Sequence, residues 1–381
     1  MSMSQRIELA TGTLHLTVRE TRLPLADLCG FAARNNAKRG FLFVSKVLGK
    51  HWPAAPSRMR QMHELLAQSL HLNTNAWLCV ALAETATGLG QGVFEALLRR
   101  QSNAAAVFLH STRYQIADWP RLVFQEPHCH APDQLLYEPR QLHLRQRFYS
   151  ARELILIDDE ISTGTTLCNL ANVYRAHNPQ LERIHLVAIT DFSGAHSAEQ
   201  FAAQIGLPVT IHALLRGDFS FTPSAIKNAE IAAPAVGNNH CDPLQLAIHL
   251  GRFGIDHPLE IPAADLEQLS AGLNTGARIL VLGTGEFMHL AFCVGLALEA
   301  RGFAVVVQAT TRSPILLDAD IGCRLRFPDN YGEGIGNYLY NVNPDAFARI
   351  LICHETPSTT LNELLQSLGS PCIAYRLDNW I

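Results

Sequence analysis

The chain of 381 residues has no long apolar run, no excess of basic residues and no paired cysteine motif. No apolar segment approaches the roughly 18 residues that a transmembrane helix needs. The first residues, Met-Ser-Met-Ser-Gln-Arg-Ile-Glu, contain no apolar core of a signal peptide. The net charge of −4, with acids and bases interspersed, disfavours a dedicated nucleic-acid binder, which usually has a basic excess. These absences predict a protein without a membrane or nucleic-acid partner.

The nine cysteines are scattered and include no Cys-x-x-Cys pair. Several lie inside apolar segments, where cysteine acts as a small hydrophobic residue. An odd number without a framework fits a reducing cytoplasm, so we expect a cytoplasmic protein. The hydrophobic content of 48% is ample for sizeable cores, and at about 150 residues per domain the length predicts two to three domains.

Strand-like segments alternate with helix-like segments along the chain, which predicts parallel α/β sheets. In the first half we expect a hairpin at 6–18, a short helix at 25–35, strands at 41–44, 76–83, 105–109, 121–124, 184–189 and 208–215, and helices at 59–72, 91–98 and 167–174. Between 222 and 242 the pattern breaks into a linker rich in Pro, Gly and Asn. We therefore predict a first domain over 1–225 and a second, smaller α/β domain over 226–381. The second has expected strands at 278–282, 303–308, 349–353 and 372–376, and helices at 286–300 and 359–368.

One segment constrains the chemistry more than any other: residues 154–166 spell Leu-Ile-Leu-Ile-Asp-Asp-Glu-Ile-Ser-Thr-Gly-Thr-Thr. The four apolar residues are too few for a helix and predict a buried parallel strand. Asp158 and Asp159 follow its carboxyl end, where open α/β sheets bind ligands. The hydroxyl-rich turn around Gly164 opens a helix, whose first N–H groups suit an anion. The pattern predicts a ligand with a diol and a phosphate, and two capping aspartates are the alternative.

This thirteen-residue segment resembles, without a gap, the phosphoribosyl pyrophosphate (PRPP) motif of the type I phosphoribosyltransferases. The resemblance implies a parallel sheet flanked by helices, with Asp158 and Asp159 holding the ribose hydroxyls and acting in catalysis. It implies that the 5′-phosphate is bound by the turn, namely Ser162, Thr163, Gly164, Thr165 and Thr166. It also implies Mg²⁺ as the cofactor, bound mainly through PRPP rather than directly by the protein, with the two aspartates as candidate contacts.

The family also binds pyrophosphate, in a loop after an earlier strand of the same sheet. Here the apolar run 77–83 is followed by Glu-Thr-Ala-Thr-Gly-Leu-Gly, residues 84–90, which we call the pyrophosphate loop. Its small residues let backbone N–H groups face an anion, and a plain helix N-cap is the alternative. The residues assigned to pyrophosphate are Glu84, Thr85, Ala86, Thr87 and Gly88, together with Lys46 and Lys50, for which ordinary surface lysines are the alternative.

Family members often carry a mobile loop that closes over the site and excludes water. The corresponding segment, Glu-Pro-His-Cys-His-Ala at 126–131, offers His128 and His130 as candidate catalytic residues. Either imidazole is suited to protonate the departing pyrophosphate or to act as a base. A metal site is the alternative for this run.

The second domain has four polar segments that follow or connect its expected strands, which predicts a ligand site at one sheet edge. Its candidate residues are Gly283, Thr284, Gly285, Glu286, Arg312, Ser313 and His354. A glycine-rich loop at 330–338 is expected to join them, and a solvated scaffold is the alternative.

Residues 311–314, Thr-Arg-Ser-Pro, spell the motif of the TRSP domain, a carboxy-terminal partner of one phosphoribosyltransferase family that residues 39–51 also resemble. The resemblance implies transfer of phosphoribose from PRPP to an unidentified, base-like acceptor with release of pyrophosphate. It further implies biosynthesis of a nucleotide-like metabolite in bacterial tellurium-resistance and stress clusters. A homodimer is a candidate state, and residues 20–60 are the candidate acceptor-reading segment. A non-catalytic PRPP sensor and the reverse reaction, cleavage of a nucleotide, remain alternatives.

Overall fold

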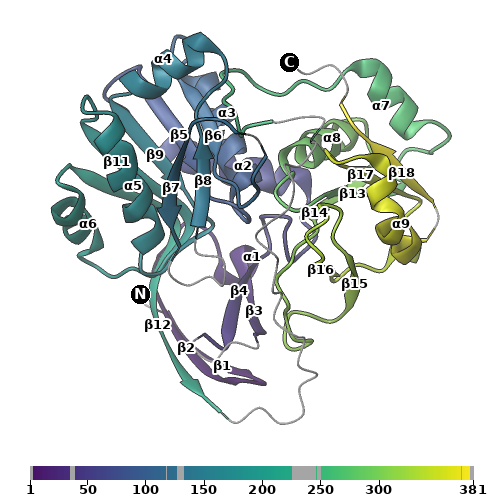
Figure 1. The fold of residues 1–381 in the computed structure, drawn as a ribbon. Helices are drawn as coiled ribbons and strands as arrows, with labels where there is room; N and C mark the ends of the chain where they lie inside the picture. Colours follow the sequence, from purple (N-terminus) through teal and green to yellow (C-terminus); the bar gives the residue numbers. More distant parts are fainter. Residues whose placement is uncertain are drawn as a thin grey trace. The chain divides into compact units, whose positions relative to one another are not determined.

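The computed structural model describes residues 3–34, 39–116, 118–126, 133–224, 246, 250–369 and 371–377. These residues form two compact units (Figure 1). Unit 2 comprises residues 60–214 and 242–259, and unit 1 comprises 1–59, 215–241 and 260–381. The predicted domain boundary at 225 lies outside the described residues. Unit 1 thus unites the beginning and the end of the chain, a grouping that the order of segments along the sequence did not indicate.

Unit 2 is built on a parallel sheet in the order β11-β9-β5-β6, with the first half of β12 beside β11. These strands are β5 (Trp77–Ala81), β6 (Val107–His110), β9 (Glu153–Ile157), β11 (Arg183–Asp191) and β12 (Val209–Pro223). Every residue of β5, β6 and β9 is buried. Strands covered on both faces read as continuous apolar runs, which explains why the sequence revealed them.

Helices cover both faces of this sheet. The crossovers β5–α3–β6 and β9–α5–β11 run in opposite directions across the strand order, so right-handed connections place α3 (Thr87–Arg100) and α5 (Thr165–His177) on opposite faces (Figure 1). The core beneath α5 also receives α4 (Leu142–Ser150), α6 (Ser197–Ile205) and the hairpin of β7 (Arg121–Gln125) and β8 (Asp133–Tyr137). The short strand β10 (Glu160–Ile161) pairs with the end of β11. This arrangement leaves the carboxyl ends of β5, β6 and β9 side by side.

Unit 1 contains a second parallel sheet in the order β14-β13-β17-β18. Its strands are β13 (Arg278–Gly283), β14 (Ala304–Ala309), β17 (Arg349–Cys353) and β18 (Cys372–Tyr375). The helices α7 (Ala263–Ser270), α8 (His289–Ala300) and α9 (Asn362–Leu368) belong to this part, as does the hairpin of β15 (Arg324–Pro328) and β16 (Gly336–Tyr340). The predicted fold class, a parallel α/β sheet followed by a smaller α/β region, is confirmed.

The amino-terminal strands complete unit 1. β1 (Met3–Leu9) pairs antiparallel with β2 (Gly12–Thr21), and β2 pairs on its other side with the second half of β12. β3 (Cys29–Ala33) pairs with β4 (Phe41–Ser45). The segment after β4 then runs along β14: Ala54 and Val307 exchange two backbone hydrogen bonds of 2.9 and 2.8 Å, and Ala309 N donates to Gly49 O at 2.8 Å. This segment therefore covers the edge of the second sheet, which would otherwise expose unpaired backbone groups.

Two expectations need correction. The helix expected over 25–35 is confined to α1 (Leu25–Leu28), because the fully buried residues of β3 pair with β4 instead. The loop expected at 330–338 ends earlier, since its last residues form β16. The predicted helix at 59–72 is α2 (Pro56–Ser69).

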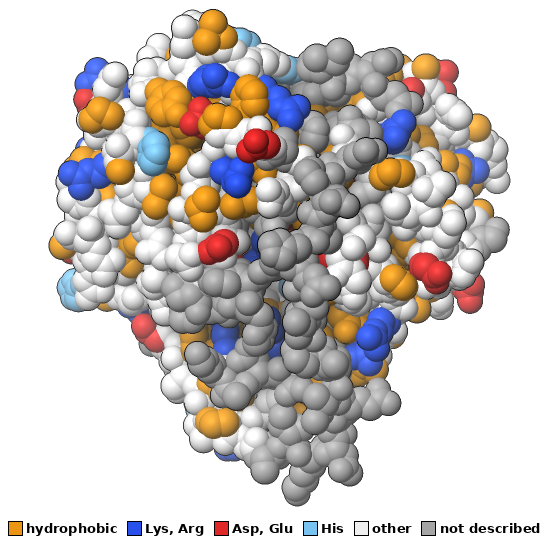
Figure 2. Space-filling view, viewed as in Figure 1, with side chains coloured by type: hydrophobic (Ala, Val, Ile, Leu, Met, Phe, Trp, Pro, Cys, Tyr) orange, Lys and Arg blue, Asp and Glu red, His pale blue; other side chains and the backbone are white. Residues whose placement is uncertain are grey.

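The described part of the chain contains no helix that is both long enough and apolar enough to span a membrane. On the face drawn in Figure 2, Lys and Arg side chains are interspersed with Asp and Glu side chains. That distribution agrees with the modest net charge of −4.

Candidate active site

The carboxyl ends of three neighbouring strands meet at one edge of the unit 2 sheet. Ala81, the last residue of β5, is in register with Ile157 of β9 and with His110 of β6. Just beyond, Leu82 N donates to Ile157 O at 2.9 Å and Ser111 N donates to Ala81 O at 2.9 Å. The segments that leave these strands, including the pyrophosphate loop and the Asp158–Asp159 pair, therefore start from adjacent positions. Open α/β sheets bind ligands at this kind of edge.

Asp158 and Asp159 are half-buried and next to each other. Asp158 Oδ1 accepts a hydrogen bond of 2.9 Å from Asp159 N, which fixes the first carboxylate. Burial, followed by the negative charge of Asp159, holds the pKa of Asp158 well above its ordinary value, and the charge of Glu126 adds to this. Hydroxyl donors and cations are the ligands that two crowded carboxylates favour.

The hydroxyl-rich turn leads into the amino terminus of α5. Gly164 is the N-cap, with φ of +69°, and no described side chain caps the helix by a hydrogen bond. A Cβ at this position would lie 2.3 Å from the Phe201 ring, so glycine is required both by the backbone and by the space. Thr163 and Thr165 join their hydroxyls at 3.0 Å beside these first amides. The turn has N–H and O–H groups of the kind that bind an anion, and its role in binding the 5′-phosphate stays a prediction.

The pyrophosphate loop is anchored just before its first residue. Ala83 N donates to Ser111 Oγ at 2.9 Å, and Gln134 Nε2 donates to Ala83 O at 2.9 Å. Ser111 Oγ in turn donates to Gln134 Oε1 at 2.5 Å. Ser111 and Gln134 are buried, and the peptide bond between Ala83 and Glu84 is cis. Both backbone groups of Ala83 are therefore held by side chains of neighbouring segments.

A charged pair continues this network towards the aspartates. Gln134 Nε2 also donates to Glu126 Oε2 at 2.7 Å, and Arg113 contacts the same oxygen at 2.6 Å. Because the charge of Glu126 raises the pKa of Asp158, it connects the loop electrostatically with the Asp158–Asp159 pair. Sequence reasoning missed Gln134, Ser111 and Arg113, since they belong to no motif and meet only through the β7–β8 hairpin. The available signal was an arginine just after a predicted strand end.

The remaining candidates of the first domain have different outcomes. His128 and His130 lie outside the described residues. Lys46 and Lys50 belong to unit 1, whereas the pyrophosphate loop belongs to unit 2. Lys46 forms an ion pair with Asp320 at 3.4 Å. Lys50 is 1% exposed, and its Nζ donates to Gly285 O at 2.7 Å and to Thr310 O at 2.9 Å. These contacts favour a structural role for Lys50, while its predicted role in binding pyrophosphate stays a prediction.

The segments predicted to form the second-domain site do converge in unit 1. Gly285 N donates to Thr310 Oγ1 at 2.9 Å, which joins the ends of β13 and β14. Tyr331 Oη contacts Thr284 O at 2.8 Å and Glu355 Oε1 at 2.9 Å. Further members are arranged around them: Glu286 and His354 are buried, Gly283 ends β13, Ser313 is half-buried, and Arg312 pairs with Glu333 at 3.1 Å. These contacts join the ends of β13 and β14 and connect Tyr331 with Thr284 and Glu355, and a ligand site among these segments stays a prediction.

At the edge of the unit 2 sheet, the carboxylate pair and the hydroxyl-rich start of α5 therefore lie next to the segment that leaves β5. A family model described as "Phosphoribosyl transferase" matches residues 28–218, about half of the chain, and a second, the TRSP domain C-terminal to it, matches 249–368. The chain belongs to the phosphoribosyl transferase family, in its two-domain form with a carboxy-terminal TRSP domain. It is accordingly a pentosyltransferase.

No curated protein matches the chain. Among solved structures, it is similar to adenine phosphoribosyltransferase from Rhodothermus marinus, with 16% identity, 50% of this chain and 96% of that chain covered, and a TM-score of 0.33. It is also similar to the enzyme from Giardia lamblia complexed with 9-deazaadenine, with 13% identity, 51% and 98% coverage, and a TM-score of 0.35. A third similar structure is orotate phosphoribosyltransferase from Aeropyrum pernix, with 13% identity, 48% of this chain and 86% of that chain covered, and a TM-score of 0.27. The assignment to the family rests on the family model.

Proposed function

We propose that the edge of the unit 2 sheet transfers phosphoribose from PRPP to a nitrogenous, base-like acceptor and releases pyrophosphate. The observation that supports this most is the register between Ala81 and Ile157, which starts the pyrophosphate loop and the PRPP motif from adjacent strand ends. PRPP carries its pyrophosphate and its 5′-phosphate on opposite sides of one ribose. Two anion-binding loops with a carboxylate pair between them match that order of groups.

In this proposal the protein positions the reactants and places charge, rather than forming a covalent bond itself. The amides and hydroxyls of Ser162, Thr163, Gly164, Thr165 and Thr166 hold the 5′-phosphate. Asp158 and Asp159 accept from the ribose hydroxyls and stabilise the positive charge that develops on the ribose. The C1–O bond breaks, pyrophosphate leaves with the electron pair, and the acceptor nitrogen bonds to C1 from the opposite face.

The donor set also fits Mg²⁺, which prefers carboxylate oxygens and substrate phosphates. The crowding of Asp158, Asp159 and Glu126, which raises the pKa of Asp158, is the kind of repulsion that a divalent cation relieves. Mg²⁺ bound between PRPP and the aspartates would neutralise charge on the leaving pyrophosphate. The pyrophosphate loop, with Glu84, Thr85, Ala86, Thr87 and Gly88, would hold the same group from the protein side.

Calorimetric titration with Mg–PRPP tests the site without knowledge of the acceptor. We expect one site per chain, and we expect the double variant Asp158→Asn with Asp159→Asn to lose binding. Unchanged affinity in that variant would refute the assignment. Pyrophosphate release from PRPP in the presence of a metabolite extract, followed by mass spectrometry of the products, then identifies the acceptor.

The same assays distinguish phosphoribosyl transfer from the two alternatives, a PRPP sensor and the reverse reaction. Tight binding of Mg–PRPP with no turnover by any acceptor would favour a PRPP sensor, and turnover of a nucleotide with pyrophosphate would favour the reverse reaction. The proposed setting is a cytoplasmic enzyme, alone or as a homodimer, that makes a nucleotide-like metabolite linked to tellurium resistance. The buried cluster of unit 1 around Thr284, Glu286 and His354 is proposed to bind a further ligand there.

A further inference from the structure

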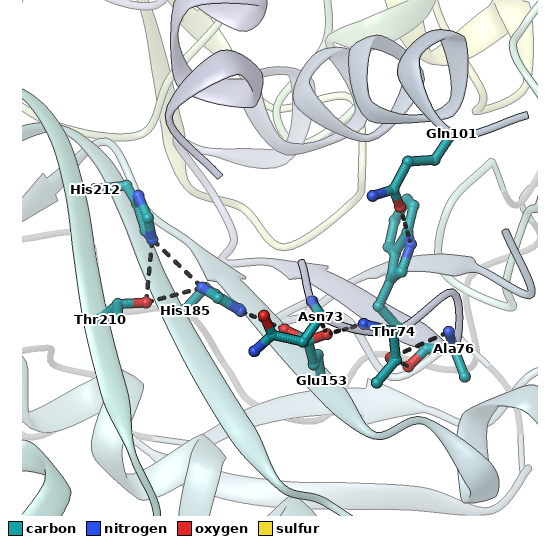
Figure 3. Close-up of polar contacts among 9 residues, drawn as sticks. Asn73, Thr74, Ala76, Gln101, Glu153, His185, Thr210 and His212 are labelled. Carbon is teal, nitrogen blue, oxygen red and sulfur yellow. Dashed lines mark hydrogen bonds and ion pairs between the residues drawn. The ribbon is translucent and has the colours of Figure 1, made fainter. Parts of the chain in front are cut away.

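A chain of polar side chains lies at the opposite end of the same sheet, where β9 and β11 begin (Figure 3). Glu153 opens β9, five residues before Asp158, and at about 3.3 Å per residue their Cα atoms are roughly 16 Å apart along the strand. The chain runs from Glu153 to His185 of β11 and on to Thr210 and His212 of β12 (Figure 3). It is therefore separate from the proposed PRPP site, and nothing in that chemistry uses it.

The first link fixes one histidine ring. Glu153 and His185 are 1% and 2% exposed, and Glu153 Oε2 lies 2.8 Å from His185 Nε2. The other oxygen, Oε1, accepts from Asn73 N and Thr74 N at 2.7 Å each. Because Oε1 is occupied by two backbone donors and Oε2 accepts from the ring, the geometry assigns the ring proton to His185 Nε2 and leaves Nδ1 facing β12.

The second link brings three donor atoms around that lone pair. His185 Nδ1 lies 3.3 Å from His212 Nε2, and Thr210 Oγ1 lies 2.8 Å from the first nitrogen and 3.1 Å from the second. Thr210 and His212 are two residues apart on β12 and so point to the same side of the strand. Both are half-buried, which leaves the outer end of the cluster accessible to solvent.

The separation of 3.3 Å between His185 Nδ1 and His212 Nε2 is that of two ligands of one tetrahedral ion, whereas the Thr210 Oγ1 contacts of 2.8 and 3.1 Å have the length of hydrogen bonds. With Zn–N bonds of about 2.0–2.1 Å, two nitrogens of a tetrahedral site are about 3.3–3.4 Å apart. Histidine ligands of metals usually donate their other ring N–H to a carboxylate, which is the arrangement of Glu153 and His185. We propose that His185 Nδ1 and His212 Nε2 bind a divalent transition-metal ion of the zinc class, with Thr210 and solvent completing the coordination. Such an ion would clamp β11 to β12 at the amino end of the sheet.

The competing interpretation is a hydrogen-bond relay in which His212 donates to Thr210, Thr210 donates to His185, and His185 donates to Glu153. Titration of the metal-stripped full chain with Zn²⁺ alone and with Co²⁺ alone distinguishes the metal site from the hydrogen-bond relay. Both titrations are made in excess Mg²⁺, which occupies sites built from oxygen ligands but not imidazole pairs. We expect one Zn²⁺ per chain and a rise in the thermal unfolding midpoint. We also expect Co²⁺ to give d–d absorption without thiolate charge transfer.

Variants locate the ion. His212→Ala should lose at least about 100-fold in Zn²⁺ affinity, and Glu153→Gln should lose about 10- to 100-fold because it orients a ligand without touching the ion. His212→Gln replaces the alanine variant if the latter does not fold. His177→Ala is the matched control, since His177 is an exposed histidine of the same unit that bonds Val173 O through Nδ1. The proposal is overturned if no stoichiometric binding occurs or if His212→Ala binds as tightly as the parent. It is equally overturned if the ion is lost from His128→Ala with His130→Ala instead.

Discussion

Replacing Gln134 by leucine is the sharpest test of how the pyrophosphate loop is held. Gln134 is 1% exposed and makes three hydrogen bonds: to Ala83 O at 2.9 Å, to Glu126 at 2.7 Å and from Ser111 at 2.5 Å. Leucine fills a similar volume but can make none of them. The variant therefore leaves the buried Ala83 carbonyl and the Ser111 hydroxyl without this partner, whereas Glu126 keeps Arg113.

The expected magnitude follows from those two groups. A buried polar group left unsatisfied costs about 1–3 kcal/mol, so two of them predict a loss of about 2–6 kcal/mol in the free energy of unfolding. If about 1.4 kcal/mol of this reflects a loop that must be reordered when the ligand binds, the Kd for Mg–PRPP rises about tenfold. Affinity for inorganic pyrophosphate should fall in parallel, because we propose that the same loop binds it.

Chemical denaturation measures the free energy of unfolding, and calorimetry measures the Kd for Mg–PRPP and for pyrophosphate. Gln125→Leu is the matched control: Gln125 is an exposed glutamine of the same hairpin, paired with Asp133, and its loss should change neither value appreciably. The reasoning is refuted if Gln134→Leu unfolds at the parent denaturant concentration and binds Mg–PRPP with parent affinity.

Three further predictions concern other parts of the two units. Gly164→Ala places a side chain at φ of +69° against Phe201, so we expect about 1–2 kcal/mol of backbone strain plus the clash, and at least a tenfold weaker Kd for Mg–PRPP by calorimetry. Gly272→Ala, with φ of +75° and open space around the Cβ, should show the strain alone. The raised pKa of Asp158 means that the folded state holds its proton more tightly. Its stabilising contribution is therefore complete below the ordinary carboxyl pKa of about 3.9 and is lost as pH rises through the raised value. Asp158→Asn should flatten that decline in a series of thermal scans, and an unchanged profile would exclude this carboxyl as its source. Lys50→Met removes two hydrogen bonds from a charged donor and should cost about 2–4 kcal/mol of stability. If Lys50 is structural, the Kd for Mg–PRPP changes by less than about threefold, whereas a role in pyrophosphate binding predicts a larger loss.

The buried strands of both units could be predicted from the sequence because each is a short continuous apolar run between turn residues. Examples are 41–44, found as β4, and 278–282, found within β13. The helix predicted over 25–35 was wrong beyond residue 28. The apolar spacing of these residues suits a helix, but Cys29–Ala33 form β3 and pair with β4. Pairing with a segment ten residues away is a tertiary effect that local periodicity does not encode.

The PRPP motif could be predicted because its carboxylates, glycine and hydroxyls are consecutive, so that one strand end and one helix start position them all. The contribution of Gln134 and Arg113 could not be predicted, because they are about twenty residues apart in the sequence. They come together at Glu126 only when β8 returns beside the end of β6. The chain from Glu153 to His212 was missed for the same reason, because its members come from three separate strands. The part of a site that lies within one turn is visible in the sequence, and the part assembled by sheet register is not.

The union of residues 1–59 with 260–381 in unit 1 has a consequence for synthesis. On the ribosome, β1 to β4 emerge first, but β12, which pairs with β2, and Asp320, which binds β3, follow more than 150 residues later. At roughly 5–20 residues per second, the amino-terminal strands wait on the order of tens of seconds with their edges unpaired. Residues 60–214, which carry the proposed PRPP site, emerge during that interval, and the remaining segment of unit 2, residues 242–259, emerges before Asp320. Unit 2 can therefore fold before β3 meets its partner at Asp320, and we expect chaperones to protect the amino-terminal strands until then.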